Sequence, residues 1–395
     1  MASLILVLNA GSSSLKFSVW SCDPSLGQSL SLTQRGAITD ISGQARFQVV
    51  DPVGKQLTTD DDLVIGAPVT HALALQRILT WLDANFPNVE FQAVGHRVVH
   101  GGDAYVQPVR VDAAVLAELR VLTQLAPLHQ PHSLDAIELL AEQRPQLTQV
   151  ACFDTAFHHT QPPVARRFAL PRALHDAGIK RYGFHGLSFE YIAQVLPNYL
   201  GEMADGRVIV AHLGSGASLC ALHQRCSIAT TMGFTPLDGL MMGTRCGALD
   251  PGVVLHLQRA CGMSVAQVEQ VLYHDSGLLG VSGISADISA LLKSHDPRAA
   301  EAVDLYVYRI ARELGSLAAA LGGVDALVFS GGVGENIAPI RARVCDATVW
   351  LDLHLDPASN AADEPRITRA DSAVSAWIIP THEDEMIAQH VLHVG

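Results

Sequence analysis

The chain alternates short apolar runs with longer segments of helical periodicity. Apolar runs at 4–8, 91–99 and 149–154 have the length and composition of buried strands. Apolar residues spaced three and four apart predict helices between them, at 70–85 and 112–125. Strands that alternate with helices in this way indicate an α/β fold. Further strands are predicted at 15–20, 325–329 and 376–380, and further helices at 133–142, 299–321, 335–346 and 384–392.

Two stretches about 200 residues apart share a strand–turn–strand pattern. Residues 4–19 read LILVLNAGSSSLKFSV and residues 208–222 read VIVAHLGSGASLCAL. The separation is too long for a solenoid repeat, and two similar domains would produce it. Hairpins with Gly/Ser turns are common, however, so the pattern alone does not choose between duplication and coincidence.

Gly- and Ser-rich turns follow three of the predicted strands, and residues 330–336 form the third of these turns. Backbone N–H groups in such turns form concave donor surfaces for anions. Lys16 lies two residues beyond Ser14, so both side chains leave the same face of a strand. Neither G-x-x-x-x-G-K-[ST] nor G-x-G-x-x-G is present. The turns together favour a nucleotide clamped between two hairpins, with its far end on the helix after Gly334.

Composition narrows the classes of partner. The 26 Lys+Arg against 39 Asp+Glu give a net charge of −13, which argues against nucleic acid. Apolar residues at 49% disfavour disorder. No apolar run reaches the roughly 18 residues of a membrane helix, and the N-terminus lacks a basic segment, so neither membrane insertion nor secretion is expected. Seven Cys without a C-x-x-C pair favour reduced thiols and a cytoplasmic location.

Two candidate site residues stand at predicted strand ends. Arg97 is flanked by small apolar residues and suits a small carboxylate or phosphate, which a guanidinium binds in bidentate fashion. An ion pair with Asp103 is an equally weighted alternative. Asp154 closes an apolar strand and is expected to point into a cleft, because buried carboxylates are rare unless they are paired or bound to a metal.

Candidate residues of a second kind lie in irregular segments. His185 stands among aromatic and Gly residues typical of a site wall, with a satisfied core histidine as the alternative. Residues 232–252 have little periodicity but five Gly, two Pro and one cation, Arg245, which predicts an apolar active-site loop that delivers this arginine. Pairs of His at 96/100, 129/132 and 158/159 suggest a metal site, but no H-E-x-x-H or Cys/His cluster supports one, so structural roles are favoured.

Taken together, these motifs resemble the acetate/propionate kinase family. The similar segments, in the family's order, are 9–16, 95–102, 153–155, 181–186, 241–245, 329–336 and 380–383. The resemblance implies the two-domain fold of actin, Hsp70 and sugar kinases, with a duplicated core and an active-site cleft between the domains. Residues 1–154 plus 380–395 would form the first domain, and 155–379 the nucleotide-binding second domain.

The resemblance implies reversible phosphoryl transfer from ATP to acetate, giving acetyl phosphate and ADP, with Mg²⁺ or with Mn²⁺ in its place, in a homodimer. It assigns catalysis to Asp154, His185 and Arg245, metal binding to Asn9 and Glu383, and the acetate carboxylate to Arg97. The acetate methyl pocket would be Val99, Leu128, Phe184 and Pro236. The nucleotide and its phosphates would contact Ser12, Ser14, Lys16, His212, Leu213, Gly214, Ser215, Gly216, Asp287, Ile288, Ser289, Gly332, Val333, Gly334, Glu335 and Asn336.

The chemistry of acetate refines this assignment. Acetate is ionised at neutral pH, so no general base is needed, and Asp154 is expected to orient an arginine or a metal-bound water. Val99 favours acetate over propionate, although one methylene gives only limited discrimination. Ser215 and Ser289 stand where the family usually has Asn and Arg, which leaves the phosphoryl donor open. The alternatives are a kinase for propionate or another short-chain acid, and a nucleotide-gated binding protein of the same fold.

Overall fold

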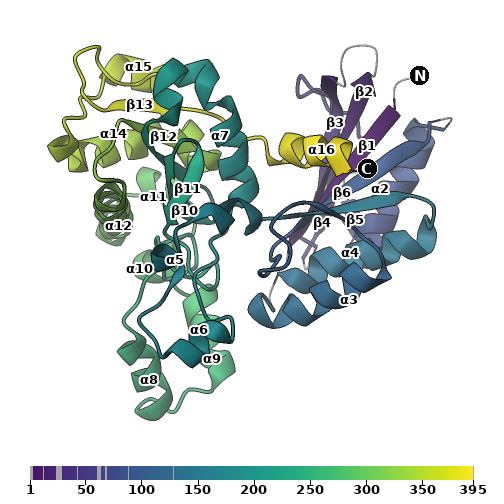
Figure 1. Ribbon diagram of the computed structural model, residues 1–395, viewed down its shortest axis with the longest axis horizontal. Helices are drawn as coiled ribbons and strands as arrows, with labels where there is room; N and C mark the ends of the chain where they lie inside the picture. Colours follow the sequence, from purple (N-terminus) through teal and green to yellow (C-terminus); the bar gives the residue numbers. More distant parts are fainter. Residues whose placement is uncertain are drawn as a thin grey trace. The chain divides into compact units, whose positions relative to one another are not determined.

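The computed structural model describes residues 3–11, 13–23, 29–41, 43–59, 64–66, 69–87, 89–127 and 129–394. The chain forms two compact units (Figure 1). The first unit comprises Met1–Ala156 together with His382–Gly395, and the second comprises Phe157–Thr381. The sequence prediction placed the two boundaries after residues 154 and 379.

A mixed sheet of order β5-β4-β3-β2-β1-β6-β8-β7 forms the centre of the first unit. Strands β1, β2 and β3 are antiparallel, whereas β6 and β8 run parallel to β1. The strands are β1 Ser3–Ala10, β2 Ser14–Asp23, β3 Ser29–Thr39, β4 Ala45–Val50, β5 Val64–Gly66, β6 Phe91–Val98, β7 Val109–Arg110 and β8 Thr148–Phe153. The helices are α2 His71–Asn85, α3 Ala113–Val121, α4 Gln130–Gln143 and α16 Glu383–Val394.

Helices cover both faces of this sheet. Leu75 of α2 and Leu140 of α4 share a buried cluster with Val94 of β6. The next residue of β6, Gly95, points to the opposite face, where α16 packs. Thr70 and Asp112 cap α2 and α3, which begin within a residue of the predicted starts.

The second unit repeats the strand arrangement of the first. Its sheet has the order β11-β10-β9-β12-β13, with three antiparallel strands followed by two parallel ones. This is the pattern of β3-β2-β1-β6-β8, and the two similar sequence stretches form β1–β2 and β9–β10. The predicted duplication is therefore confirmed. The strands are β9 Arg207–Leu213, β10 Ala217–His223, β11 Cys226–Thr230, β12 Ala326–Ser330 and β13 Ser375–Ile378.

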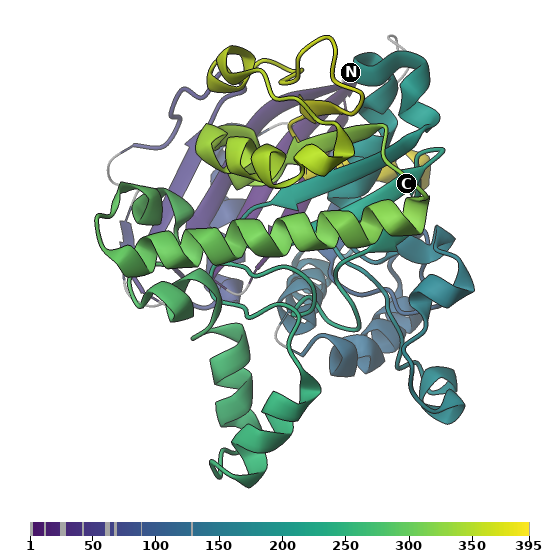
Figure 2. The ribbon, with the colours of Figure 1, turned by 90° about the vertical axis from the view of Figure 1, so that its left-hand side faces the viewer.

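Two long helices flank the second sheet. Helix α7 (Gly186–Leu200) buries Phe189 and Ile192 against Val208 and Val210. Helix α12 (Pro297–Leu321) lies across the other side, as Figure 2 shows. Shorter helices are α5 Pro163–Arg166, α6 Arg172–Asp176, α8 Pro251–Arg259, α9 Val265–Tyr273, α10 Gly277–Ser282, α11 Ile288–Lys293, α13 Gly331–Asn336, α14 Ala338–Ala347 and α15 Pro357–Ala361. Among the described residues, no helix is long and apolar enough to span a membrane.

The single helix predicted over 335–346 is wrong. The segment forms two helices, α13 and α14, which meet at Ile337 with φ −115° and ψ 77°. Pro339 lies in the first turn of α14, and because proline has no N–H the helical ladder stops before it and starts again. The turn predicted at 330–336 is itself helical from Gly331 onward.

Three buried histidines make the stability of the fold depend on pH. Burial lowers the pKa of His96, His100 and His158 to about 4. Unfolded histidine titrates near pH 6.5, so between that pH and 4 the unfolded chain binds protons that the folded chain excludes. The free energy of unfolding therefore falls as the pH drops through this window, by about 1.4 kcal/mol per pH unit for each histidine.

We expect the calorimetric unfolding temperature to be markedly lower at pH 5 than at pH 7. His96→Gln keeps a donor for Gln149 Oε1, which His96 Nε2 contacts at 2.7 Å, and should reduce this pH dependence. The exposed His393 offers a control, since His393→Gln should leave the dependence unchanged. An unchanged dependence in His96→Gln would contradict the assignment.

Candidate active site

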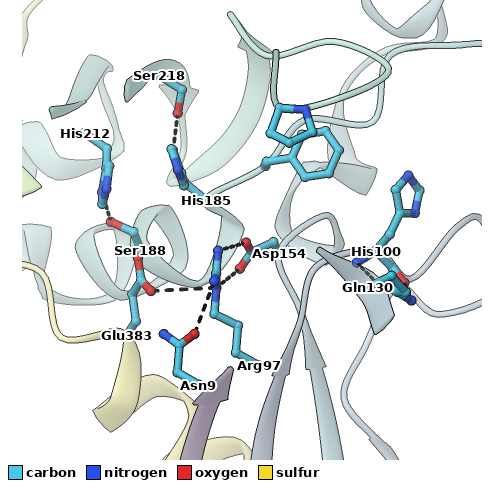
Figure 3. A network of polar contacts seen from close by, with 12 residues as sticks. Asn9, Arg97, His100, Gln130, Asp154, His185, Ser188, His212, Ser218 and Glu383 are labelled. Carbon is cyan, nitrogen blue, oxygen red and sulfur yellow. Dashed lines mark hydrogen bonds and ion pairs between the residues drawn. The ribbon is translucent and has the colours of Figure 1, made fainter. Parts of the chain in front are cut away.

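Three side chains of the first unit meet at the guanidinium of Arg97, near the end of β6 (Figure 3). Arg97 Nε donates to Asp154 Oδ1 at 3.0 Å, and Arg97 Nη2 donates to Asp154 Oδ2. Arg97 Nη1 donates to Asn9 Oδ1 at 3.2 Å, and Glu383 Oε2 lies 4.0 Å from Arg97 Nε. Because β1, β6 and β8 are parallel, their carboxyl ends place Asn9, Arg97 and Asp154 at one edge of the sheet.

The charge balance keeps Arg97 cationic. Burial alone would lower its pKa, but the carboxylates of Asp154 and Glu383 outweigh that effect and raise the pKa above its ordinary value. A guanidinium carries five N–H groups. The contacts with Asp154 and Asn9 use three of them, and the remaining two match the demand of one bidentate carboxylate. Arg97 thus forms an ion pair as the alternative prediction had it, but with Asp154 in place of Asp103.

Gly95 explains how a residue from the end of the chain reaches Arg97. Gly95 and Arg97 are two apart on β6, so they face the same side of the sheet. A Cβ at Gly95 would overlap Ile387 Cγ2 and would lie 2.8 Å from Val391 Cγ2. The missing side chain therefore lets α16 lie directly on β6, which brings Glu383, the first residue of α16, to Arg97.

The hairpin of β1 and β2 places a second cation, Lys16, beside Asn9. The strand register pairs Asn9 with Lys16, and residues directly opposite each other project from the same face. Lys16 is exposed and Ser14 is half-buried. Two of the predicted contacts, Ser12 and Leu128, lie outside the described residues.

In the second unit, His185 is held at three points. It caps the start of α7 in the left-handed conformation, with φ 59° and ψ 26°. Its Nδ1 lies 2.8 Å from Ser218 Oγ, and its ring stacks on His212 with 4.4 Å between centroids. His212 is fixed in turn, since its Nδ1 lies 2.7 Å from Ser188 Oγ (Figure 3).

Arg245 borders the same Gly-rich turn as His185. A Cβ at Gly216 would lie 3.2 Å from His185 Nε2 and 3.5 Å from Arg245 Nη2. Arg245 Nη1 donates to Pro236 O at 2.8 Å. The segment 232–252 thus places Arg245 beside His185 at the backbone of Gly216.

The other predicted nucleotide contacts of the second unit gather at this turn. Gly243 N donates to Ser215 O at 3.4 Å, and a Cβ at Gly243 would lie 3.2 Å from Ala286 O. Gly331 has φ 75°, and a Cβ there would lie 2.8 Å from Leu213 O. Residues 212–216, 243–245, 286–289 and 331–336 are thus brought together from four parts of the chain.

Comparisons with known proteins identify the family. The model of the acetokinase family matches residues 4–389. The chain belongs to the acetokinase family. An acetate kinase of Rhodopseudomonas palustris (strain TIE-1) is 55% identical over 99% of this chain and 98% of its own length. For an acetate kinase of Rhizobium meliloti, the identity is 48% over 98% of this chain and 97% of its own length.

Solved structures place the fold in the same family. A crystal structure of Porphyromonas gingivalis acetate kinase is similar with a TM-score of 0.86 and 35% identity, over 99% of both chains. A propionate kinase from Francisella tularensis gives a TM-score of 0.91 and 34% identity, over the full length of both chains. The predicted actin/Hsp70/sugar-kinase-like fold is therefore confirmed, as is the predicted activity class, phosphoryl transfer to a carboxyl group. The family implies ATP, ADP, acetate and acetyl phosphate as small-molecule partners, and a divalent metal.

Glu335, another predicted nucleotide contact, stabilises the turn at the start of α13. Its Oε1 accepts hydrogen bonds from Gly331 N at 2.8 Å and from Thr381 N at 3.1 Å. Arg341 supports the same turn, because its Nη1 donates to Gly334 O at 3.0 Å and to Glu335 O at 2.8 Å. The side chains of Glu335 and Arg341, both in the same unit, thus fix the backbone of α13.

Three of the four residues predicted for the acetate methyl pocket lie among the described residues, and each of the three is buried in its own unit. Val99 is buried in the first unit, and Phe184 and Pro236 are buried in the second. Cys246, next to Arg245, has its thiol pKa raised by burial. This favours an inert thiol over an oxidation-sensitive one, because the thiolate is the reactive form.

Sequence reasoning missed the residues that support the site. Ser218 holds His185 and was not singled out. Gly95 belongs to the similar segment 95–102, but its role, to make room for α16, was not predicted. The sequence does hold a signal for Ser218. It is the second residue of β10, two positions after Gly216, and side chains two apart along a strand point to the same face. Ser188 was not predicted to matter either, and the structure shows its Oγ 2.7 Å from His212 Nδ1.

The donor set of the first unit fits a divalent cation that arrives with a nucleotide. Asn9 offers an amide oxygen and Glu383 a carboxylate, and both lie beside Arg97. Mg²⁺ prefers oxygen ligands and is held by one or two carboxylates together with substrate phosphates and water. No three His, Cys, Asp or Glu side chains of the described ranges form a cage for a metal.

Proposed function

We propose that this acetokinase transfers the γ-phosphoryl group of ATP directly to acetate, reversibly, with Mg²⁺ or with Mn²⁺ in its place. The observation that carries the proposal is the guanidinium of Arg97, which Asp154 and Asn9 fix while two of its N–H groups remain for a small carboxylate. Val99, Phe184 and Pro236 would enclose the methyl group. The cation would be held by Asn9 and Glu383, and it would offset phosphate charge.

Acetate needs no deprotonation, since carboxyl groups titrate near pH 4 to 5. Asp154 is only 2% exposed in its side chain, and both of its oxygens accept from Arg97. Its role is therefore to orient Arg97 and to keep it charged. Asp154 is not proposed as a general base, because acetate carries no proton to remove at neutral pH.

The transferring phosphoryl group would be met by groups of the second unit. An acetate oxygen forms a bond to Pγ, and the bond from Pγ to the β-phosphate oxygen breaks, so that ADP leaves with the electron pair. Arg245 and His185, which border Gly216, would donate to the equatorial oxygens as charge moves. Lys16 and the Ser12–Ser14 turn would bind the phosphates. The nucleotide would lie on 212–216, 287–289 and 332–336, which makes 155–379 the nucleotide-binding domain.

The test is acetyl hydroxamate formation by the purified protein. ATP, GTP or pyrophosphate serves as donor, and acetate or propionate as acceptor. We expect ATP with acetate to give the highest kcat/KM, and propionate to be slower by about 10- to 200-fold, the range that one methylene supports. Binding of ATP without acid-dependent product for any donor would refute the proposal and would favour a nucleotide-gated binding protein.

We also propose a cytoplasmic homodimer. All seven cysteines lie among the described residues and are free thiols, as a reducing compartment favours. Leu249, Leu255 and Val265, on and around α8 and α9, expose large apolar side chains that a second copy would cover. Light scattering after gel filtration should give twice the chain's 42.1 kDa, and a monomer mass would refute the dimer.

A further inference from the structure

A buried histidine that has no part in the proposed chemistry, His158, contacts the residue that precedes His185. His158 is 1% exposed and belongs to the second unit. Its Nδ1 lies 2.9 Å from Ser227 Oγ on β11, and its Nε2 lies 2.9 Å from the carbonyl oxygen of Phe184. Its ring meets Phe189 of α7 edge-on, with 5.6 Å between centroids. His158 thus connects a strand, a helix and the residue that precedes His185.

The direction of each hydrogen bond of His158 follows from its surroundings. Burial lowers the pKa of His158 to about 4, so at neutral pH the ring carries a single N–H. The Phe184 carbonyl can only accept, which puts this N–H on Nε2 and leaves Nδ1 to accept from the Ser227 hydroxyl. Cys220 Sγ lies 3.3 Å from Ser227 Oγ, and burial raises its pKa to about 12, so it stays a thiol that can donate to Ser227.

The bond to Phe184 acts on the backbone that carries His185. The Phe184 carbonyl belongs to the peptide group that ends at His185 N. The backbone of His185 is left-handed, which is a strained conformation for a non-glycine residue. Gly183 has φ 83°, and a Cβ there would lie 2.6 Å from His158 Cδ2, so the ring packs directly on the preceding backbone as well. Strain of this kind persists only where neighbouring groups hold it.

We propose that His158 is a positioning residue, whose Nε2–H fixes the Phe184–His185 peptide and thereby aims the His185 ring at Gly216. Ser218 fixes the ring at Nδ1, and His158 fixes the backbone from behind. The inference rests on the role proposed for His185, because a mispositioned ring matters to turnover only if the ring acts there. His158 itself touches no reacting atom.

The test compares His158→Leu, which removes the donor, with His158→Gln, whose amide N–H can reach the Phe184 carbonyl. We expect His158→Leu to lower kcat by about 10- to 100-fold, the range that a misplacement near 1 Å produces, with little change in the KM for acetate. His158→Gln should regain most of the loss. His96→Leu, which removes an equally buried neutral histidine of the first unit, serves as the stability control and should keep kcat. A wild-type kcat in His158→Leu, or no rescue by His158→Gln, would overturn the proposal.

A double-mutant cycle separates the proposal from the role of His185. If His158 acts through His185, the double variant His158→Leu/His185→Ala should have nearly the same kcat as His185→Ala alone. A double variant whose loss of kcat equals the product of the two single losses would overturn the proposal. The position of the His185 ring can also be followed by NMR without a kinetic assay, from the ¹⁵N chemical shifts of its ring nitrogens. These resonances are identified by their absence in His185→Ala. The ¹⁵N chemical shifts should change in His158→Leu and should have wild-type values again in His158→Gln. Unchanged shifts in His158→Leu would overturn the proposal that His158 positions the ring. A wild-type kcat in His185→Ala alone would instead refute the catalytic role of His185.

Discussion

Arg245→Ala should lower kcat by about 10³-fold or more while it leaves the KM for acetate nearly unchanged, since a cation that meets the transferring phosphoryl group acts mainly in the transition state. The geometry behind this expectation is the position of Arg245 Nη2 beside the backbone of Gly216, next to His185 Nε2. Steady-state kinetics in the direction of acetyl phosphate formation, with both substrates varied, measure the effect. Arg245→Lys should recover only a small part, because lysine replaces a planar fork of donors with a point charge.

Arg97→Ala supplies the matched contrast. The two N–H groups of Arg97 that Asp154 and Asn9 do not use form the proposed carboxylate site. Loss of the guanidinium should therefore raise the KM for acetate much more than it lowers kcat. Removal of Arg97 also leaves Asp154 buried without its cation, and thermal unfolding should therefore be recorded in parallel. Equal changes of kcat and KM in the Arg245 and Arg97 variants would contradict the division of roles between the two arginines.

Arg341→Leu should lower the free energy of unfolding by about 3–5 kcal/mol, the cost of breaking a buried charged network. Arg341 is fully buried, and its Nε donates to Asn360 Oδ1 at 2.8 Å and its Nη2 to Asn360 O at 2.9 Å. It also forms an ion pair with Asp363 and donates to the carbonyls of Gly334 and Glu335. Without it, these carbonyl oxygens would lose their donors inside the unit.

The second unit's calorimetric transition measures this loss, and Arg343→Leu is the control. Arg343 lies two residues away in α14 and pairs with the exposed Asp304, so its removal should cost less than about 1 kcal/mol. Because Arg341 holds the backbone of α13, the KM for ATP should rise in Arg341→Leu and stay unchanged in Arg343→Leu. Equal stability of the two variants would show that the buried network contributes little.

Local sequence signals identified most of the elements and the chemistry of the site. The period of apolar residues predicted α2 and α3, and the duplicated strand–turn–strand stretches correspond to β1–β2 and β9–β10. The Gly-rich turns, Arg97, His185 and Arg245 were found as motifs because each depends on a few neighbouring residues. The single helix expected over 335–346 failed because Pro339 interrupts the ladder, a signal that was present but not used.

The amino-acid sequence by itself determined which side chains could bind an anion and which strands would carry them. Which groups meet was decided by the tertiary structure. Asp103 is near Arg97 along the chain, yet the partner of Arg97 is Asp154, 57 residues away. The parallel register of β6 and β8 pairs Arg97 with Cys152, and Asp154, two residues beyond Cys152, therefore lies at the same edge and on the same face. Glu383 reaches the same edge only because Gly95 lets α16 pack closely on β6. Such pairings depend on contacts between distant segments, whose free energy no local pattern encodes.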